Sequence, residues 1–136
     1  QGTCSWANSG MYHLSEEPRL PFNNTTSYTY AYIFERFYQD MYSTLSQVND
    51  VLYAIVNDNM PMGTNGKDTK MVEAFSYFIQ GTTQGYLSMV YDKVFIMTEN
   101  TDLETLELST YQEGTQSAIK SLDKCITICE ANNFTV

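Results

Sequence analysis

The spacing of apolar residues predicts helices over most of this chain. Between Phe34 and Ile55, apolar residues recur alternately four and three positions apart, which places them along one side of a helix. We therefore expect a first helix over 33–57, followed by a turn at "MPMGTNGKD". The side chains expected in the core are Phe34, Tyr38, Met41, Tyr42, Leu45, Val48, Leu52, Tyr53 and Ile55.

A second helix is expected over 69–98, with two glycines in its middle. Gly81 and Gly85 each cost roughly 1 kcal/mol against alanine in a helix interior. A neighbouring helix backbone that approaches closely would explain them, and a bend is the competing explanation. The stripe expected to face the core is Met71, Phe75, Phe78, Thr82, Gly85, Met89 and Ile96, widened by Ile79, Leu87 and Val90.

A third helix is expected over 110–131. Ser109 with Gln112, and Thr110 with Glu113, both match a capping box. No strand pattern competes with the three helices. The sequence thus predicts an all-α fold in which the first two helices form an antiparallel hairpin and the third packs beside them.

The domain organisation follows from these elements. Residues 1–32, punctuated by Gly and Pro, are expected to form an irregular arm, and 33–131 a three-helix scaffold within one domain, 1–136. Helix-hairpin stacks bury each unit against the next. We therefore expect the chain to belong to a longer protein, or its open end to be covered by another copy.

Charge and missing motifs exclude several function classes. Sixteen acidic residues against seven basic ones give a net charge of −9, which argues against a nucleic-acid partner. No nucleotide-binding fingerprint occurs, and no nucleophile pattern surrounds the single histidine, His13. Glu16 and Glu17 are adjacent, so their side chains diverge, unlike the paired carboxylates of glycosidases. We expect no catalytic residue and no cofactor, and an enzyme is the least favoured class.

The three cysteines cannot all pair within one chain. Cys125 and Cys129 are four residues apart on one face of the third helix, while Cys4 is distant in sequence. Buried free thiols are the favoured interpretation. A disulfide from Cys4 to one of the pair is the alternative outside the cytosol.

Metal binding has little support in the sequence. With a single histidine, a transition-metal site is not expected. The acidic connector contains Glu99, Asp102 and Glu104, whose oxygens could hold Ca²⁺. It lacks the spacing of a known calcium loop, so a solvated connector is favoured.

Aromatic residues of the arm are the candidate ligand-binding residues. A pyranose ring stacks its C–H face on a flat aromatic surface while polar neighbours meet its hydroxyls. Five aromatic residues lie near Asn8, Asn23 and Asn24, which suits a sugar platform, although packing of the arm onto the helices is the alternative. They are Trp6, Tyr12, Tyr28, Tyr30 and Tyr32.

An ordered series of motifs links the chain to a known family. The series includes Ser5-Trp6, "SEEPR" at 15–19, "MVEAFSYFIQG" at 71–81, "GYLSMVYDKVFI" at 85–96 and "TDLETLEL" at 101–108. In this order and spacing the chain resembles the amino-terminal part of a SusD/RagB-type protein, a surface lipoprotein of Bacteroidota-like bacteria.

The resemblance implies a tetratricopeptide-like helical scaffold in which Gly81 and Gly85 are close-approach points. It also implies capture of an oligosaccharide or another nutrient at the outer membrane, without catalysis, together with a SusC-type transporter. A second hypothesis, from the open helical end, is a self-assembling extracellular structural protein that forms an oligomer or a filament.

Overall fold

The structure, a computed structural model, describes residues 25, 27 and 31–134. The chain divides into two compact units, 1–40 and 41–136, so that the boundary falls within helix α3 (Tyr32–Val56). In the first unit the described residues form the opening turns of α3, where Arg36 and Asp40 make an exposed ion pair of 3.9 Å. The two units are described separately below.

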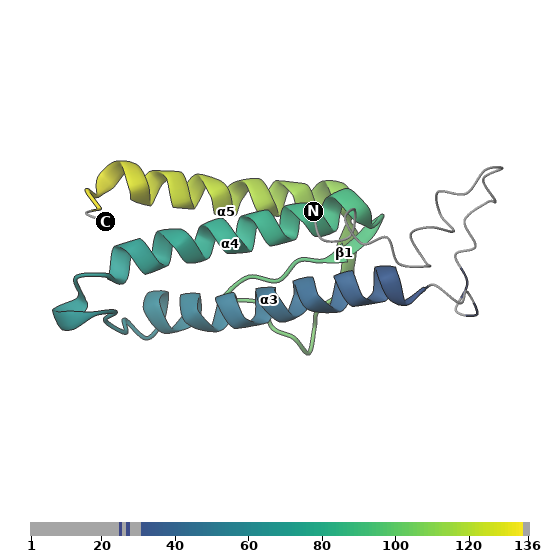
Figure 1. Ribbon diagram of the computed structural model, residues 1–136, viewed down its shortest axis with the longest axis horizontal. Coiled ribbons are helices and arrows are strands. Elements are labelled where there is room, and N and C mark those ends of the chain that lie inside the picture. Colours follow the sequence, from purple (N-terminus) through teal and green to yellow (C-terminus); the bar gives the residue numbers. More distant parts are fainter. Residues whose placement is uncertain (1–24, 26, 28–30, 135–136) are drawn as a thin grey trace. The chain divides into compact units, whose positions relative to one another are not determined.

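The second unit is mainly helical (Figure 1). It contains the rest of α3, a short 3₁₀ turn η1 (Thr64–Gly66), helix α4 (Thr69–Val90), strands β1 (Lys93–Phe95) and β2 (Leu108–Thr110), and helix α5 (Tyr111–Ala131). Helix α4 runs antiparallel to α5 and to residues 41–56 of α3 (Figure 1). The expected bounds of the first and third helices are confirmed to within one residue, as is the turn between α3 and α4.

The second helix ends earlier than its sequence pattern predicts. Tyr91 is extended, with φ −119° and ψ 138°, and its N–H donates to Leu87 O as the last helical bond. Residues 93–95 then pair antiparallel with 108–110, with Val94 opposite Ser109. The predictions of a helix to residue 98 and of no strand are therefore wrong, because a three-residue strand is too short to produce a readable period.

Helix α5 begins at the capping box expected from the sequence. The Thr110 hydroxyl accepts from the Glu113 N–H, and the Glu113 carboxylate accepts from the Thr110 N–H at 2.9 Å. These reciprocal bonds satisfy two donors at the helix start, which fixes where α5 leaves β2. Of the two boxes expected, Thr110 with Glu113 is the one confirmed.

The apolar core of the second unit centres on α3. Leu45, Val48, Leu52 and Ile55 are buried, as their spacing predicts. The Tyr42 hydroxyl accepts from Phe95 N at 2.7 Å and joins α3 to β1. Tyr53 lies outside the apolar stripe and is exposed, so the prediction that it belongs to the core is wrong. Phe34, Tyr38, Met41 and Tyr42 are half-buried.

Helix α4 presents the opposite side to the one expected. Met71, Phe75, Phe78 and Met89, predicted to face the core, are exposed. The buried side is largely polar, with Gly81 and Leu87 among its members; the others are Ala74, Ser76, Tyr77, Gln80, Thr83, Gln84 and Ser88. The prediction fails because Tyr77 and Gln80 bond to groups of other elements, namely Asn49, Glu99 and Ser121, which offsets the cost of burying them.

The closest helix pair is α4 with α5, rather than the first two helices. A Cβ added at Gly81 would lie 2.9 Å from Ala118 O and 2.7 Å from Leu122 Cγ. At Gly85 it would meet Ala118 Cβ at 3.7 Å, an ordinary contact. Gly81 thus lies where the two backbones approach most closely, and Gly85 lies beside that point with room to spare.

Candidate functional site

A buried polar network connects α3, α4, α5 and the connector between the strands. At its centre Gln80 of α4, 2% exposed, donates from Nε2 to Asn49 Oδ1 at 2.7 Å and to Glu99 Oε2 at 3.1 Å. Its Oε1 accepts from the Ser121 hydroxyl of α5 at 2.6 Å. One amide therefore fixes the relative positions of four segments that are far apart in sequence.

This network orients the Asn49 side chain. Because Glu99 and Asn49 Oδ1 both accept from Gln80 Nε2, the NH₂ group of Asn49 must point away from Gln80. Asn49 is 8% exposed, and its Nδ2 has no hydrogen-bond partner in the described part of the chain. A buried amide donor without a partner is uncommon in folded proteins, and Gln84 Nε2 of α4 is a second one, so each of these two positions lacks a partner among the described residues.

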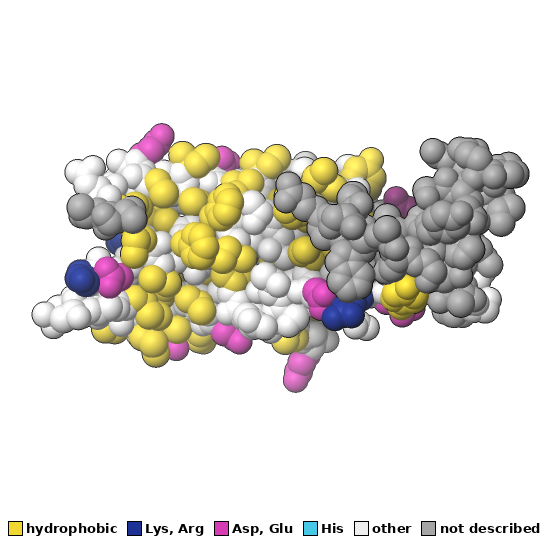
Figure 2. Space-filling view, viewed as in Figure 1, with side chains coloured by type: hydrophobic (Ala, Val, Ile, Leu, Met, Phe, Trp, Pro, Cys, Tyr) yellow, Lys and Arg dark blue, Asp and Glu magenta, His cyan; other side chains and the backbone are white. Residues whose placement is uncertain are grey.

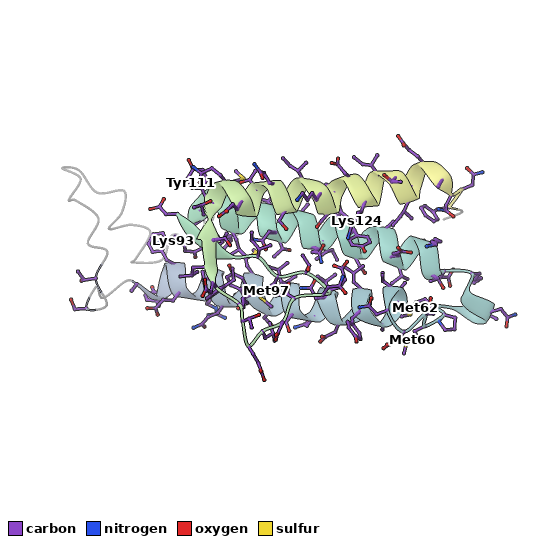
Figure 3. The ribbon with its side chains drawn as sticks, turned by 180° about the vertical axis from the view of Figure 1, so that it is seen from behind. Met60, Met62, Lys93, Met97, Tyr111 and Lys124 are labelled. Carbon is purple, nitrogen blue, oxygen red and sulfur yellow. The ribbon has the colours of Figure 1, made fainter. Side chains whose placement is uncertain are left out.

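The network also holds a charged pair. The Lys124 ammonium lies 3.2 Å from Glu99 Oε1 and 4.5 Å from the centre of the Tyr77 ring, and the Tyr77 hydroxyl donates to Glu99 Oε1 at 3.1 Å. Figure 3 shows Lys124 on α5. Glu99 is almost fully buried, whereas about half of the Lys124 side chain is exposed.

Hydrogen bonds keep both groups charged in spite of burial. Burial opposes the charge on Glu99, but bonds from Gln80, its own backbone N–H and Lys124 hold the pKa of its carboxyl below the usual value. Burial likewise opposes the charge on Lys124, and Glu99 outweighs it, so the pKa of the ammonium is raised. Burial and the Glu99 charge raise the pKa of Tyr77.

A pocket of about 360 Å³ opens beside Asn49. One wall comes from α3, through Ser46, Asn49, Asp50 and Tyr53, and the other from residues 97–103 of the connector. The connector carries Met97 along this side of the molecule (Figure 3), and Asn57 Nδ2 donates to Asn100 Oδ1 at 3.0 Å, which ties it to the end of α3. The pocket is therefore built on a braced loop.

The pocket offers the groups that recognise a polyhydroxylated ligand. The Asp50 and Asp102 carboxylates can accept from ligand hydroxyls, and Asn49, whose Nδ2 is enclosed, lies in the α3 wall. Tyr53, half exposed, adds a flat aromatic surface to the same wall. Carboxylates, an amide and an aromatic ring together suit a sugar better than an apolar ligand.

The acidic connector does not form a metal site in the described residues. No group of three or more His, Cys, Asp or Glu side chains there could hold an ion. Glu99 is committed to the polar network, and Asp102 Oδ1 accepts from the Glu104 N–H at 3.0 Å while both residues are exposed. The calcium alternative therefore finds no ligand cluster among Glu99, Asp102 and Glu104.

The structure describes one of the five ligand-binding residues expected from the sequence. Trp6, Tyr12, Tyr28 and Tyr30 lie outside the described residues, as do Cys4, His13, Glu16 and Glu17. Tyr32 is the first residue of α3 and is exposed. Sequence reasoning missed Asn49, Asp50 and Gln80; the one available signal was the pair of glutamines, Gln80 and Gln84, beside glycines in the uncharged part of α4.

The two cysteines of α5 differ in their surroundings. Both are free; Cys125 is half-buried and Cys129 is exposed, so the expectation of two buried thiols is wrong for Cys129. Burial, followed by the neighbouring Cys129, raises the pKa of the Cys125 thiol. A thiol with a raised pKa is a weak nucleophile, which assigns no reactive role to Cys125.

Comparison with known proteins adds no relative. Nothing matches the chain among protein-family models, curated proteins or solved structures. Among the described residues no helix is both long enough and apolar enough to cross a bilayer.

Proposed function

We propose that this chain is a non-enzymatic binding protein for an oligosaccharide or a similar hydroxyl-rich nutrient. The observation that carries the proposal is the pocket beside Asn49, with its unpartnered amide, its carboxylates and the Tyr53 ring. Asn49 Nδ2 is enclosed in the free chain, so a ligand hydroxyl would supply its missing partner by entering as the pocket wall moves aside. Recovering an unmet hydrogen bond of this kind gives selectivity for ligands that carry a hydroxyl at the right position.

The sequence resemblance extends this proposal to a setting. A SusD-type protein built on a tetratricopeptide-like scaffold would present the pocket at the bacterial cell surface and work with a SusC-type transporter in the outer membrane. The helical fold of the second unit is compatible with such a scaffold. The aromatic residues of the arm, Trp6, Tyr12, Tyr28, Tyr30 and Tyr32, would then add a second contact surface for a long glycan.

Binding by the full chain tests the proposal. Titration calorimetry against a panel of glucose, mannose and galactose oligosaccharides should identify a ligand, and Tyr53→Ala should weaken its binding several-fold to about tenfold. Tyr111→Ala is the matched control, because Tyr111 is similarly exposed but does not line the pocket. The proposal fails if no oligosaccharide binds, or if the two variants lose the same affinity.

A second candidate function is a self-assembling extracellular structural protein. It is supported by the apolar side chains that α4 leaves exposed, which an associating surface would cover. Negative-stain microscopy and light scattering distinguish the candidates, because a monodisperse monomer at high concentration excludes assembly. Glycan binding, in contrast, does not require the chain to assemble.

A further inference from the structure

One side of the α4–α5 hairpin has the pattern of a helix-packing surface, and none of the described helices packs against it. On α4 the residues Met71, Phe75, Phe78, Thr82, Gly85 and Met89 alternate four and three apart, the repeat of a coiled-coil seam. Phe75 and Met89 are 61% and 80% exposed. We call this side, with Ile119, Leu122 and Ile126 of α5, the open face.

The open face is continuous across both helices. The two antiparallel helices touch where Gly81 of α4 faces Ala118 and Leu122 of α5. On each helix, the residues that lie about a quarter turn around from this contact, in the same sense along the sequence, point to the same side of the helix pair. On α4 these are the residues from Met71 to Met89 that alternate four and three apart, which form the seam. On α5 they include Ile119 and Ile126, which are both exposed. Figure 2 looks onto this side and shows hydrophobic side chains gathered over the two helices.

Charge is missing where the seam runs. From Ala74 to Tyr91 the chain contains no charged residue, although its net charge is −9. Thr82, the polar member of the seam, donates its hydroxyl to Phe78 O at 2.8 Å, so this group already has a partner and can be buried without loss. The absence of charge therefore distinguishes this stretch from an ordinary solvated helix surface.

The size of the open face fits an interface. Phe75 and Phe78 are each about half exposed, and with 150–250 Å² per aromatic side chain they present roughly 200 Å². The largest apolar patch of a typical monomer is about 300–600 Å². The exposed Met71, Met89, Ile119 and Ile126 bring the face toward the roughly 800 Å² per partner of a stable complex.

We propose that the open face binds a second copy of this chain in a closed, two-fold dimer. The seam is self-complementary when two α4 helices pack antiparallel with the axis at Thr82. Phe75 then lies opposite Met89 of the second copy, Thr82 lies opposite Thr82, and Phe78 is level with Tyr86, beside the space that Gly85 leaves. The small residues Thr82 and Gly85 let the two helices approach, while the large residues fill the seam on either side.

The same axis brings the α5 helices together. Because Gly81 faces Ala118 and Leu122, the axis crosses α5 near Ile119, which then packs near Leu122 of the second copy. The result is a four-helix bundle of two hairpins. An isologous contact of this kind closes after two copies, so filament growth from the open face is not expected.

Sedimentation of the full chain over a range of concentrations tests the dimer. We expect a monomer–dimer equilibrium that tightens as salt rises, because salt screens the repulsion between two chains of charge −9. Phe75→Glu and Met89→Lys should each weaken the dimer about 30-fold or more. Both positions are exposed, so circular dichroism should show an unchanged fold. Leu108→Glu, a charge added at an exposed leucine of β2, is the control and should have no effect.

The register has its own test. In the double variant Phe75→Glu, Met89→Lys each glutamate faces a lysine of the second copy, so dimerisation should recover most of the loss seen in either single variant. A chain that stays monomeric at every concentration, a dimer insensitive to both single variants, or growth into larger assemblies overturns the proposal. Failure of the double variant to recover overturns the antiparallel register. None of these results depends on glycan binding.

Discussion

The contrast between Gly81 and Gly85 gives a stability prediction with opposite signs at two neighbouring positions. Replacing either glycine by alanine should gain the same helix propensity, about 1 kcal/mol. At Gly85 the new Cβ would lie 3.7 Å from Ala118 Cβ, so nothing opposes this gain. Gly85→Ala should therefore stabilise the fold by up to about 1 kcal/mol.

At Gly81 the added methyl group has no room. It would lie 2.9 Å from the backbone oxygen of Ala118, which moves only if α5 moves. Overpacking of this kind costs typically 1–3 kcal/mol, which cancels or exceeds the propensity gain. Gly81→Ala should thus be neutral or destabilising by up to about 2 kcal/mol, and the two variants should differ by about 1–3 kcal/mol.

Denaturant unfolding followed by circular dichroism measures this difference. The protein is kept dilute, so that association contributes nothing, and equal denaturant slopes confirm that both variants unfold from the same compact state. At about 4 °C per kcal/mol for a chain of 136 residues, the melting temperatures should separate measurably. If both alanines stabilise equally, α4 and α5 do not approach closely at Gly81 and the helix packing described here is wrong.

Three further predictions concern the charged pair, the α5 cap and the thiols. Lys124→Met should lower the free energy of unfolding at pH 7 by about 1–3 kcal/mol, because it leaves Glu99 buried without its cation while Lys124 itself is half exposed. This deficit should shrink as pH falls through the lowered pKa of Glu99, which then takes up a proton, and as pH rises through the raised pKa of Lys124, which then loses its own. Thr110→Ala should destabilise by about 1 kcal/mol in the same unfolding assay. Alkylation followed by mass spectrometry should modify Cys129 well before Cys125.

Each of these predictions has a result that contradicts it. A Lys124→Met deficit that stays constant as pH passes through the pKa values of Glu99 and Lys124 would mean that the ion pair does not contribute. An unchanged stability of Thr110→Ala, with Thr115→Ala as the control within α5, would remove the capping box from the account. Equal alkylation rates for the two thiols would show that Cys125 is not shielded.

The helices themselves were predictable because their signals are local. The four-and-three spacing from Leu45 to Ile55 defines both the extent and the buried side of α3, and it needs no information from elsewhere in the chain. The cap formed by Thr110 and Glu113 is contained in four consecutive residues. Gly81 could be identified as a close-approach point because glycine is unfavourable in a helix without such a reason.

The buried side of α4 was not predictable, because its partners are distant. Gln80 can be buried because its side chain forms hydrogen bonds with Asn49, Glu99 and Ser121. These partners lie 19 to 41 residues away in sequence. Periodicity places apolar residues on the buried side of a helix, and it therefore predicted that Phe75 and Met89 face the core. The pocket could not be predicted for the same reason. One wall comes from α3 and the other from an irregular connector, which has no hydrophobic periodicity to interpret.

The Asn49 side chain offers the most direct test of the proposed binding site. Its Nδ2 protons give a separate signal in ¹⁵N-resolved NMR spectra of the full chain. On addition of a bound oligosaccharide, this signal and the backbone amides of residues 97–103 should shift together, while that of Gly81, which lies against α5, stays in place. An oligosaccharide that binds without moving the Asn49 signal would show that the pocket is not the site.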